Sequence, residues 1–381
     1  MYIIQFYLLK IELKIIKKIS YYINIIEMSL NINPQIKSDM YDLDSKLKNN
    51  VFNTNTQTTE SDEYLLNPEN NRLTIYPIQN PSIWQAYKNQ QATFWTAEEI
   101  DFSKDYDHFL NLNSNEQHFI KMILAFFSSS DTIVNINLGE RFLNDVKIRE
   151  AITTYTFQMM MEGVHSETYS LQIDNIIRDP EEKQKLFDAI KNYPCIAKKA
   201  EWAVKWIESD DCFAKRLVAF AIFEGVYFSG SFCSIFWFKK KNLMPGLCAS
   251  NELIARDEGL HCSFAVLLYS MLKNKLDEKE IHDMFRDAVE VERDFICDSL
   301  PCALLGMNSK LMSEYIEYVA DRLLVDLGYN KIWSTKNPFD FMESISVEGK
   351  TNFFEFRPTQ YQKASVLNTT KDKSFEFSDD F

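Results

Sequence analysis

Apolar residues recur three and four positions apart along most of the chain, from Ile83 to about Asn330. That spacing puts apolar side chains on one face of an α-helix. The periodic stretches predict helices over residues 115–144, 148–177, 181–207, 212–240, 249–274, 278–300 and 308–328. Breaks are expected at Asp179-Pro180, Pro194 and Pro245-Gly246. We therefore expect an all-α protein without a separate second domain.

The beginning of the chain lacks this pattern. Residues 1–70 are expected to form a largely disordered N-terminal extension, since much of it is rich in Asn, Ser, Thr and Asp, and order should begin near Arg72. Charged residues interrupt the Ile- and Tyr-rich residues 1–27, so no uncharged run reaches the roughly 20 residues of a membrane span. We expect Met28 to be the working start of the protein and no membrane to be involved.

The folded domain is predicted over residues 71–350. Residues 351–381 are polar for most of their length and are predicted to form a flexible tail. Just before the first long helical stretch, Thr96-Ala-Glu-Glu has the pattern of a capping box, which predicts the start of a helix.

Composition agrees with a helical, globular protein. Of 381 residues 46% are hydrophobic, enough for a large core, and only 9 are Gly and 10 are Pro, which disfavours a turn-rich β fold. A net charge of −14 repels phosphate backbones, so nucleic acid is not expected as a partner. The 7 cysteines are odd in number and include no Cys-x-x-Cys, which indicates reduced thiols and a cytoplasmic location.

Two of the 5 histidines share a distinctive context. Glu162 stands three residues before His165, and Glu258 stands three residues before His261, each pair within an apolar helical stretch. Residues i and i+3 lie on the same face of a helix, so each pair can present a carboxylate and an imidazole to one point. Such donors suit iron or manganese, and zinc less exclusively.

Two further acids complete the pattern. Asp131 and Glu224 lie among apolar neighbours, where a bare charge is too costly to bury unless it is paired or binds a metal. Asp131 precedes Glu162 by 31 residues and Glu224 precedes Glu258 by 34, about the length of one helix and the return. Two helical hairpins joined by a crossover make a ferritin-like bundle. One Glu-x-x-His could be an incidental surface pair, but two such copies predict a metal site.

For other residues near these pairs, spacing alone allows both a functional and a purely structural interpretation. Tyr169 shares the helix face of the first pair, so it is either a phenol that the metals oxidise or a core tyrosine. Phe228, Phe232 and Ile254 lie four residues apart from the ligands or from each other, and wall the site or simply pack the core. Asp257 either orients a ligand histidine or lies on the helix surface.

Six long stretches make a family resemblance specific. The chain from about Arg72 to Phe381 resembles the small, radical-generating subunit of class I ribonucleotide reductase, of the eukaryotic type. The stretches are Ile83-Trp-Gln-Ala-Tyr-Lys, Ala92-Thr-Phe-Trp-Thr-Ala-Glu-Glu, His165-Ser-Glu-Thr-Tyr-Ser-Leu-Gln-Ile-Asp, Phe228-Ser-Gly-Ser-Phe, Ser250-Asn-Glu-Leu-Ile-Ala-Arg-Asp-Glu-Gly-Leu-His and Gly349-Lys-Thr-Asn-Phe-Phe-Glu.

This resemblance implies a ferritin-like bundle with additional helices around a di-iron four-helix core. It implies two iron ions per chain and a stable radical on Tyr169, protected by a pocket of Phe228, Phe232 and Ile254. One iron would be held by Asp131, Glu162 and His165, and the other by Glu224, Glu258 and His261.

The resemblance also implies a partner and a route. Dioxygen and the di-iron centre would generate the radical, which would pass through Trp95, Asp257 and Tyr361 to a large catalytic subunit that reduces ribonucleotides to deoxyribonucleotides. The chain would form a homodimer and dock the large subunit through residues 375–381, an acidic and aromatic segment. The alternatives on the same fold are another di-iron oxidase (a desaturase or ligand-binding oxidase), an iron-storage protein, or a structural subunit without chemistry.

Overall fold

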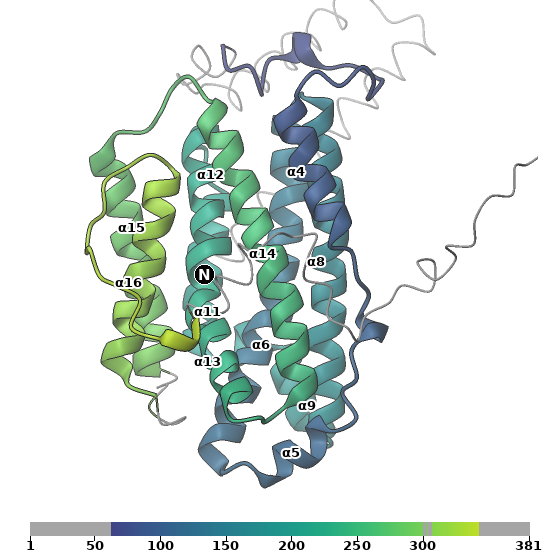
Figure 1. Cartoon of the computed structure of the whole chain (residues 1–381), viewed down its shortest axis with the longest axis vertical. Coiled ribbons are helices and arrows are strands. Elements are labelled where there is room, and N and C mark those ends of the chain that lie inside the picture. Colours follow the sequence, from purple (N-terminus) through teal and green to yellow (C-terminus); the bar gives the residue numbers. More distant parts are fainter. Residues whose placement is uncertain (1–61, 300–302, 304–306, 343–381) are drawn as a thin grey trace, which may run out of the picture. The chain divides into compact units, whose positions relative to one another are not determined.

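A computed structural model describes residues 62–299, 303 and 307–342 (Figure 1). All described residues belong to one compact unit. These residues form helices and no strands, which confirms the all-α prediction. The predicted start at Met28 and the predicted tail, residues 351–381, lie outside the described residues.

Four long helical segments form the centre of the fold, and Figure 1 shows them side by side. The third of them is continuous through a π-helical turn, η4. The segments are α6 (Ser114–Asn137), α8 (Arg149–Ile176), α12–η4–α13 (Phe213–Ile222, Phe223–Tyr227 and Ser229–Lys240) and α14 (Pro245–Met271). α6 packs along α8, and α12 and α13 pack along α14, so the core consists of the two predicted hairpins.

Additional helices surround this core. The crossover between the hairpins runs through α9, α10 and α11, and α15 and α16 cover the side of α12 and α13. The bounds are α4 (Pro81–Ala92), α5 (Asp105–Asn111), α7 (Leu143–Asp145), α9 (Pro180–Phe187), α10 (Ala189–Asn192), α11 (Pro194–Ile207), α15 (Glu278–Arg293) and α16 (Ser309–Asp326), with short turns η1 (Pro68–Asn70), η2 (Ala97–Glu99), η3 (Leu138–Phe142) and η5 (Asp294–Ser299).

The helix boundaries depart from the prediction at three places. α14 begins at Pro245 rather than at residue 249, because proline is well suited to the first position of a helix. The stretch 181–207 forms three helices, since the backbone at Asp188 leaves the helical conformation and Pro194 starts α11. At Thr96 the backbone N–H donates to Glu99 Oε1 at 3.2 Å, as in a capping box, but the helix that follows is a single 3-10 turn.

Buried carboxylates tie the first described residues to the bundle. Glu150, at the start of α8, has no exposed surface and accepts hydrogen bonds from Arg72 (2.6 Å) and from the backbone N–H of Gln79 (2.7 Å). Although burial raises the pKa of Glu150, hydrogen bonds from backbone N–H groups lower it more, and the net pKa lies below its usual value. Glu63 likewise accepts from the backbone N–H of Lys273 at 2.8 Å, so described contacts begin before the expected onset at Arg72.

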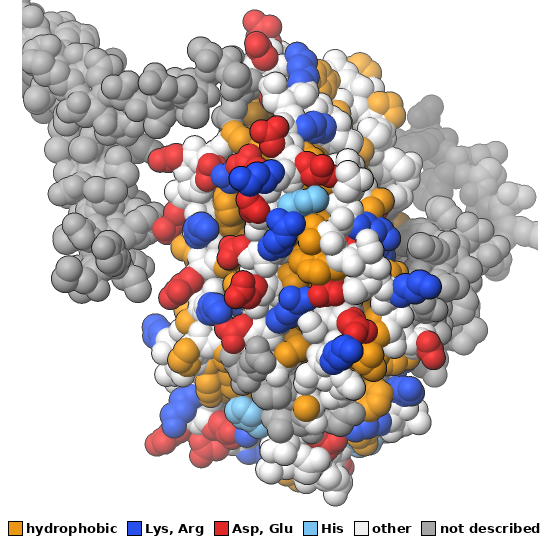
Figure 2. All heavy atoms as spheres, turned by 90° about the vertical axis from the view of Figure 1, so that its left-hand side faces the viewer, with side chains coloured by type: hydrophobic (Ala, Val, Ile, Leu, Met, Phe, Trp, Pro, Cys, Tyr) orange, Lys and Arg blue, Asp and Glu red, His pale blue; other side chains and the backbone are white. Residues whose placement is uncertain are grey.

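Among the described residues, two segments are long and apolar enough to cross a membrane, Ser114–Asp145 and Phe213–Lys240. Within their most apolar windows, 67% and 94% of the residues are buried inside the protein. Their composition is therefore explained by their central place in the bundle. Figure 2 views the side that α15 and α16 cover, where positive and negative side chains are interspersed between apolar ones.

Candidate metal centre

The structure brings the six predicted ligands together in the middle of the bundle. Each of the four core segments contributes at least one of them, and none is more than 3% exposed. The ligands are Asp131 on α6, Glu162 and His165 on α8, Glu224 on η4, and Glu258 and His261 on α14. Helical spacing explains the two pairs, because three residues along a helix return to nearly the same face.

The ligand atoms form two overlapping groups, in each of which all atoms lie within 4.8 Å of one another. The first group contains Asp131, Glu162 and His165. The second contains Glu162 again, with Glu224, Glu258 and His261. The grouping matches the division of ligands that the family resemblance implies, and it adds that Glu162 reaches both halves.

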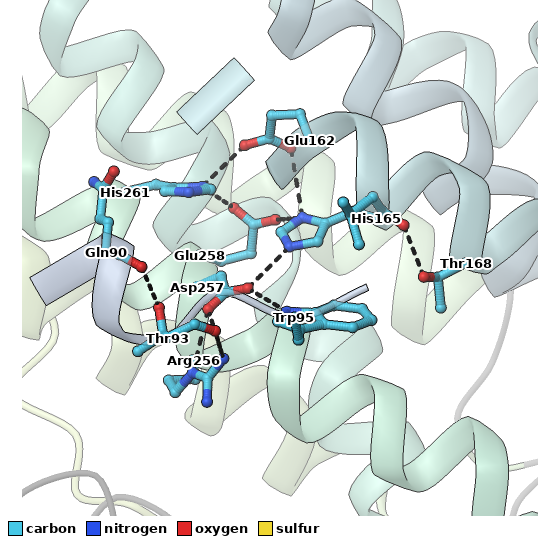
Figure 3. Close-up of polar contacts among 11 residues, drawn as sticks. Gln90, Thr93, Trp95, Glu162, His165, Thr168, Arg256, Asp257, Glu258 and His261 are labelled. Carbon is cyan, nitrogen blue, oxygen red and sulfur yellow. Dashed lines mark hydrogen bonds and ion pairs between the residues drawn. The ribbon is translucent and has the colours of Figure 1, made fainter. Parts of the chain in front are cut away.

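The contacts between the two Glu-x-x-His pairs are closer than those within them. His165 Nδ1 lies 3.0 Å from Glu258 Oε1 and 3.6 Å from Glu162 Oε2. His261 Nδ1 lies 2.9 Å from Glu162 Oε1 and 3.2 Å from Glu258 Oε2. Figure 3 shows Glu162 and Glu258 with one oxygen toward each imidazole. Both carboxylates therefore lie between the two imidazoles and could contribute to either half of a metal site.

Unsatisfied polar atoms test whether the cluster fits metal ions. Asp131 Oδ2 and both carboxylate oxygens of Glu224 are buried without a hydrogen bond to a described residue, and the oxygens of Glu162 face only imidazole nitrogens. Leaving buried oxygens without a partner is costly, so their lone pairs fit a shared cation. Four carboxylates carry a charge that two divalent cations balance, and oxygen and imidazole donors suit iron or manganese. The residues fit a two-metal centre.

Burial and crowding shift the pKa values of these groups. Burial raises the pKa of Asp131 and of Glu224, and the neighbouring carboxylates raise both further. Burial lowers the pKa of His261, but Glu162 and Glu258 raise it to a net value of about 9. The protein without cations would therefore hold protons in this cluster, and bound cations would displace them.

Asp257 lies behind His165, on the side away from the other ligands. It is 2% exposed, and its Oδ2 lies 3.3 Å from His165 Nε2 and accepts the indole N–H of Trp95 at 2.7 Å (Figure 3). Its Oδ1 accepts from Arg256 at 3.1 Å. Burial raises the pKa of Asp257, but the hydrogen bond with His165 and the Arg256 charge lower it overall. An ionised Asp257 accepts a hydrogen bond from the Nε2–H group of His165, which leaves the Nδ1 lone pair for a metal.

Trp95 therefore lies next to the ligand histidine as well as beside Asp257. Its ring stacks on His165 with centroids 6.0 Å apart and planes inclined by 22°. The location of Asp257 excludes the reading of this residue as a helix-surface aspartate. Trp95 and Asp257 are 162 residues apart, so no local spacing could have joined them.

Tyr169 is 2% exposed and faces an aromatic cluster. Phe127 of α6 stacks on it at 4.6 Å with an interplanar angle of 24°. Phe127 in turn contacts Phe232 at 5.3 Å and Phe228 at 5.7 Å. Burial raises the pKa of Tyr169, and the nearby charge of Asp131 raises it further, so the phenol keeps its proton.

Phe127 was missed by the sequence analysis, although a signal was present. It stands four residues before Asp131 on the same helix, which places it on the same face. Ile254, the third predicted wall residue, is fully buried on α14. Tyr361 and residues 375–381 lie outside the described residues, so their predicted roles stay predictions.

A four-helix core that buries four carboxylates and two imidazoles is the arrangement of a ferritin-like protein, and the cluster is consistent with a metal site. Comparison with known families makes this more specific: residues 72–338 match the family described as "Ribonucleotide reductase, small chain". The chain belongs to this family. The match favours the reductase reading over the other di-iron oxidases and the storage proteins.

Individual relatives agree. The protein is 54% identical over 324 residues to the ribonucleoside-diphosphate reductase small chain of Nicotiana tabacum, which covers 84% of this protein and 98% of that one. The corresponding protein from Plasmodium falciparum (isolate Dd2) is 56% identical over 322 residues, covering 84% and 92%. Both matches extend over nearly the full length of the relative.

Solved structures give the same fold. The ribonucleotide reductase Rnr4 homodimer from Saccharomyces cerevisiae superposes with a TM-score of 0.69 at 38% identity, over 76% of this chain and 94% of that one. Dimanganese(II)-NrdF from Streptococcus sanguinis, 18% identical, superposes with a TM-score of 0.64 over 73% and 98%. At that identity the likeness concerns the fold alone, and it confirms the ferritin-like prediction.

Proposed function

We propose that this chain binds two iron ions and generates a stable radical on Tyr169, which a large catalytic subunit uses to reduce ribonucleoside diphosphates. The observation that carries the proposal is the place of Tyr169, a buried phenol beside the Asp131 half of the cluster and stacked on Phe127. When bound, two ferrous ions with dioxygen, together with one further electron supplied from outside, would supply the oxidant that removes one electron and one proton from this phenol.

The protein's own residues set the conditions for that step. Glu162 and Glu258 face both imidazoles and would be among the residues that hold the two ions. The raised pKa of Tyr169 keeps the phenol protonated until it is oxidised. Phe127 and its aromatic neighbours exclude water from the ring, and an oxidised tyrosine persists only where water and reductants are kept out.

The contacts of Asp257 support a route out of the centre. Its Oδ2 contacts both His165 Nε2 and the indole N–H of Trp95, so the three side chains form one buried chain of hydrogen bonds. We propose that the oxidising equivalent moves along this chain through Trp95, and then through Tyr361, to the large subunit. Asp257 would keep its hydrogen bond with His165 while the oxidising equivalent moves to Trp95.

Partners follow from the family. We propose a homodimer, as the Saccharomyces cerevisiae relative is described, that docks the large subunit through residues 375–381. An acidic segment ending in aromatic residues suits a groove on a partner. None of the six described cysteines is in a disulfide, which agrees with a reducing, cytoplasmic location.

Electron paramagnetic resonance (EPR) tests the radical. Metal-free protein loaded with Fe(II) without oxygen and then exposed to air should give a tyrosyl signal. Tyr169→Phe should abolish that signal, whereas Tyr155→Phe, at a fully buried tyrosine on the same helix stacked on Phe142, should retain it. A signal that survives in Tyr169→Phe would refute the assignment of the radical to Tyr169.

Deletion of residues 375–381 tests the docking separately. The truncated chain should form the radical as before and lose ribonucleotide reduction with the large subunit. Unchanged activity would contradict the docking role. It would not bear on the assignment of the radical to Tyr169.

A further inference from the structure

A buried ion pair contacts the third core segment just after the turn η4, and the candidate metal site does not explain it. Lys199 of α11 and Glu292 of α15 are both fully buried, and Nζ lies 2.7 Å from Glu292 Oε2. A buried pair of this kind often stabilises no more than apolar residues of the same shape would. Stability alone is therefore a weak reason for its presence, and its other contacts indicate what it does.

Both side chains bind backbone groups at one point of the third core segment. Lys199 Nζ donates to the carbonyl of Tyr227 at 2.6 Å, and the N–H of Gly230 donates to Glu292 Oε1 at 3.2 Å. Tyr227 is the last residue of the π-helical turn η4, and Gly230 lies in the first turn of α13. A π-helical turn interrupts the regular hydrogen-bond ladder of an α-helix. The pair therefore connects α11 and α15 to the junction where that ladder changes.

Close packing fits the pair to this junction. The Lys199 ammonium lies 3.7 Å from the centroid of Phe126 and 4.2 Å from that of Phe295, contacts that are favourable for a desolvated cation. At Gly230, a Cβ atom would stand 2.8 Å from Glu292 Oε1, too close for an ordinary contact. Only glycine leaves the carboxylate its present approach to the backbone.

The same turn carries one metal ligand. Glu224 is the second residue of η4, and it is the one ligand of the six that lies on a π-helical turn rather than on an α-helix. Such a turn has weaker backbone support, so its ligand needs an external anchor more than the others do. Glu224 also belongs to a single half of the cluster, the group with Glu258 and His261.

We infer that Lys199 and Glu292 form a positioning clamp that holds η4 and thereby sets the orientation of Glu224 toward the metal centre. This inference rests on the proposed two-metal function. The clamp acts on one half of the cluster, since neither Asp131 nor His165 is carried by η4. Loss of the clamp should therefore weaken the binding of one ion and leave the other.

The charges dictate how the clamp must be removed. Burial lowers the pKa of Lys199 to about 8 and raises the pKa of Glu292 to about 7, so each charge depends on the other. Removal of one partner would leave an uncompensated buried charge. The test variant is therefore Lys199→Met with Glu292→Leu, which replaces both by apolar residues of similar volume. Glu292→Gln is the conservative variant: its amide oxygen can still accept from Gly230, and Lys199, whose pKa burial already lowers, can give up its proton and still donate to the Tyr227 carbonyl.

Titration of the metal-free full chain with Mn(II), followed by EPR, separates the two binding steps. The wild-type chain should bind two ions that give a coupled signal. In the double variant one step should weaken by about 10–100-fold, the usual effect of losing a residue that orients a ligand, while the other step is unchanged. Glu292→Gln should restore most of the wild-type affinity.

A part-buried ion pair serves as the control. Arg72 and Glu150 are joined at 2.6 Å at the start of α8, far along the chain from η4, and Arg72→Met with Glu150→Leu should leave both steps unchanged. If the double clamp variant does not fold, Gly230→Ala, which displaces Glu292 without removing a charge, should show the same selective loss. The inference is wrong if the two Mn(II) binding steps of the double variant match those of the wild type, or if both steps weaken together. A wild-type chain that binds fewer than two ions would instead overturn the proposed function.

Discussion

The carboxylate of Asp257 has more partners than an amide could satisfy, which makes Asp257→Asn an informative substitution. Oδ2 faces two donors, Trp95 Nε1 at 2.7 Å and His165 Nε2 at 3.3 Å, while Oδ1 faces the Arg256 guanidinium at 3.1 Å. An asparagine has one acceptor oxygen and one NH2 donor. Whichever way the amide is turned, its NH2 group faces the donors that now bind one of the two carboxylate oxygens. At least one of the present hydrogen bonds is then lost.

The size of the effect follows from these contacts. A buried hydrogen bond to a charged group contributes about 1.5–3 kcal/mol, so the free energy of unfolding should fall by about that amount. Asp257 also fixes which nitrogen of His165 carries the proton. Loss of such a partner reduces metal affinity about 10–100-fold, equivalent to about 1.4–2.8 kcal/mol.

Urea unfolding of the metal-free protein and Mn(II) titration measure the two effects. Asp321→Asn is the matched control, because Asp321 is equally buried but accepts from the backbone N–H groups of Ile332 (2.8 Å) and Trp333 (3.2 Å) rather than from a ligand histidine. The control should lower stability and leave metal affinity unchanged. The reasoning about His165 is refuted if Asp257→Asn binds metal as the wild type does, or if Asp321→Asn weakens binding as much.

Three further outcomes are expected. Phe127→Ala should lower the free energy of unfolding by about 3–5 kcal/mol, measured in urea, because it opens a cavity beside Tyr169, and the tyrosyl EPR signal should decay faster than in the wild type. The pKa of Glu150 is lowered in the folded chain, so its carboxylate stabilises the fold above the unfolded pKa, about 4.5, and that contribution is lost as the pH falls through the folded value. Glu150→Gln should therefore cost about 1.5–3 kcal/mol in urea unfolding at pH 7 and progressively less below pH 4.5; a cost independent of pH would contradict this. Removal of metal by a chelator should lower the melting temperature, since an ion at 100 times its Kd stabilises the folded state by about 2.7 kcal/mol; an unchanged melting temperature would argue against a metal site.

Local patterns made much of the centre predictable. Glu162 with His165, and Glu258 with His261, could be identified because three residues along a helix share a face, whatever the helix packs against. Asp131 stood out because a charge among apolar residues needs a partner. Similar reasoning failed for Phe127, since a phenylalanine in an apolar stretch looks the same whether it lines a radical site or fills the core.

The helices were predictable for the same local reason, and their exact ends were not. Apolar spacing marks the face that will be buried, but the start of α14 at Pro245 depends on the backbone conformation of the residue before it, Met244, which is left-handed. The single 3-10 turn after Thr96 likewise depends on how the chain runs onward to the bundle rather than on its capping box.

Side-chain type and helical periodicity were enough to predict an all-helical fold, the six candidate ligands and the tyrosine on the helix face of the first pair. The packing of the helices added that Glu162 and Glu258 each face both imidazoles, that Asp257 joins Trp95 to His165, and that Lys199 and Glu292 meet next to Tyr227 and Gly230. These contacts join residues far apart in the chain. Their geometry depends on the depth and rotation at which separate helices pack, which periodicity within one helix does not specify.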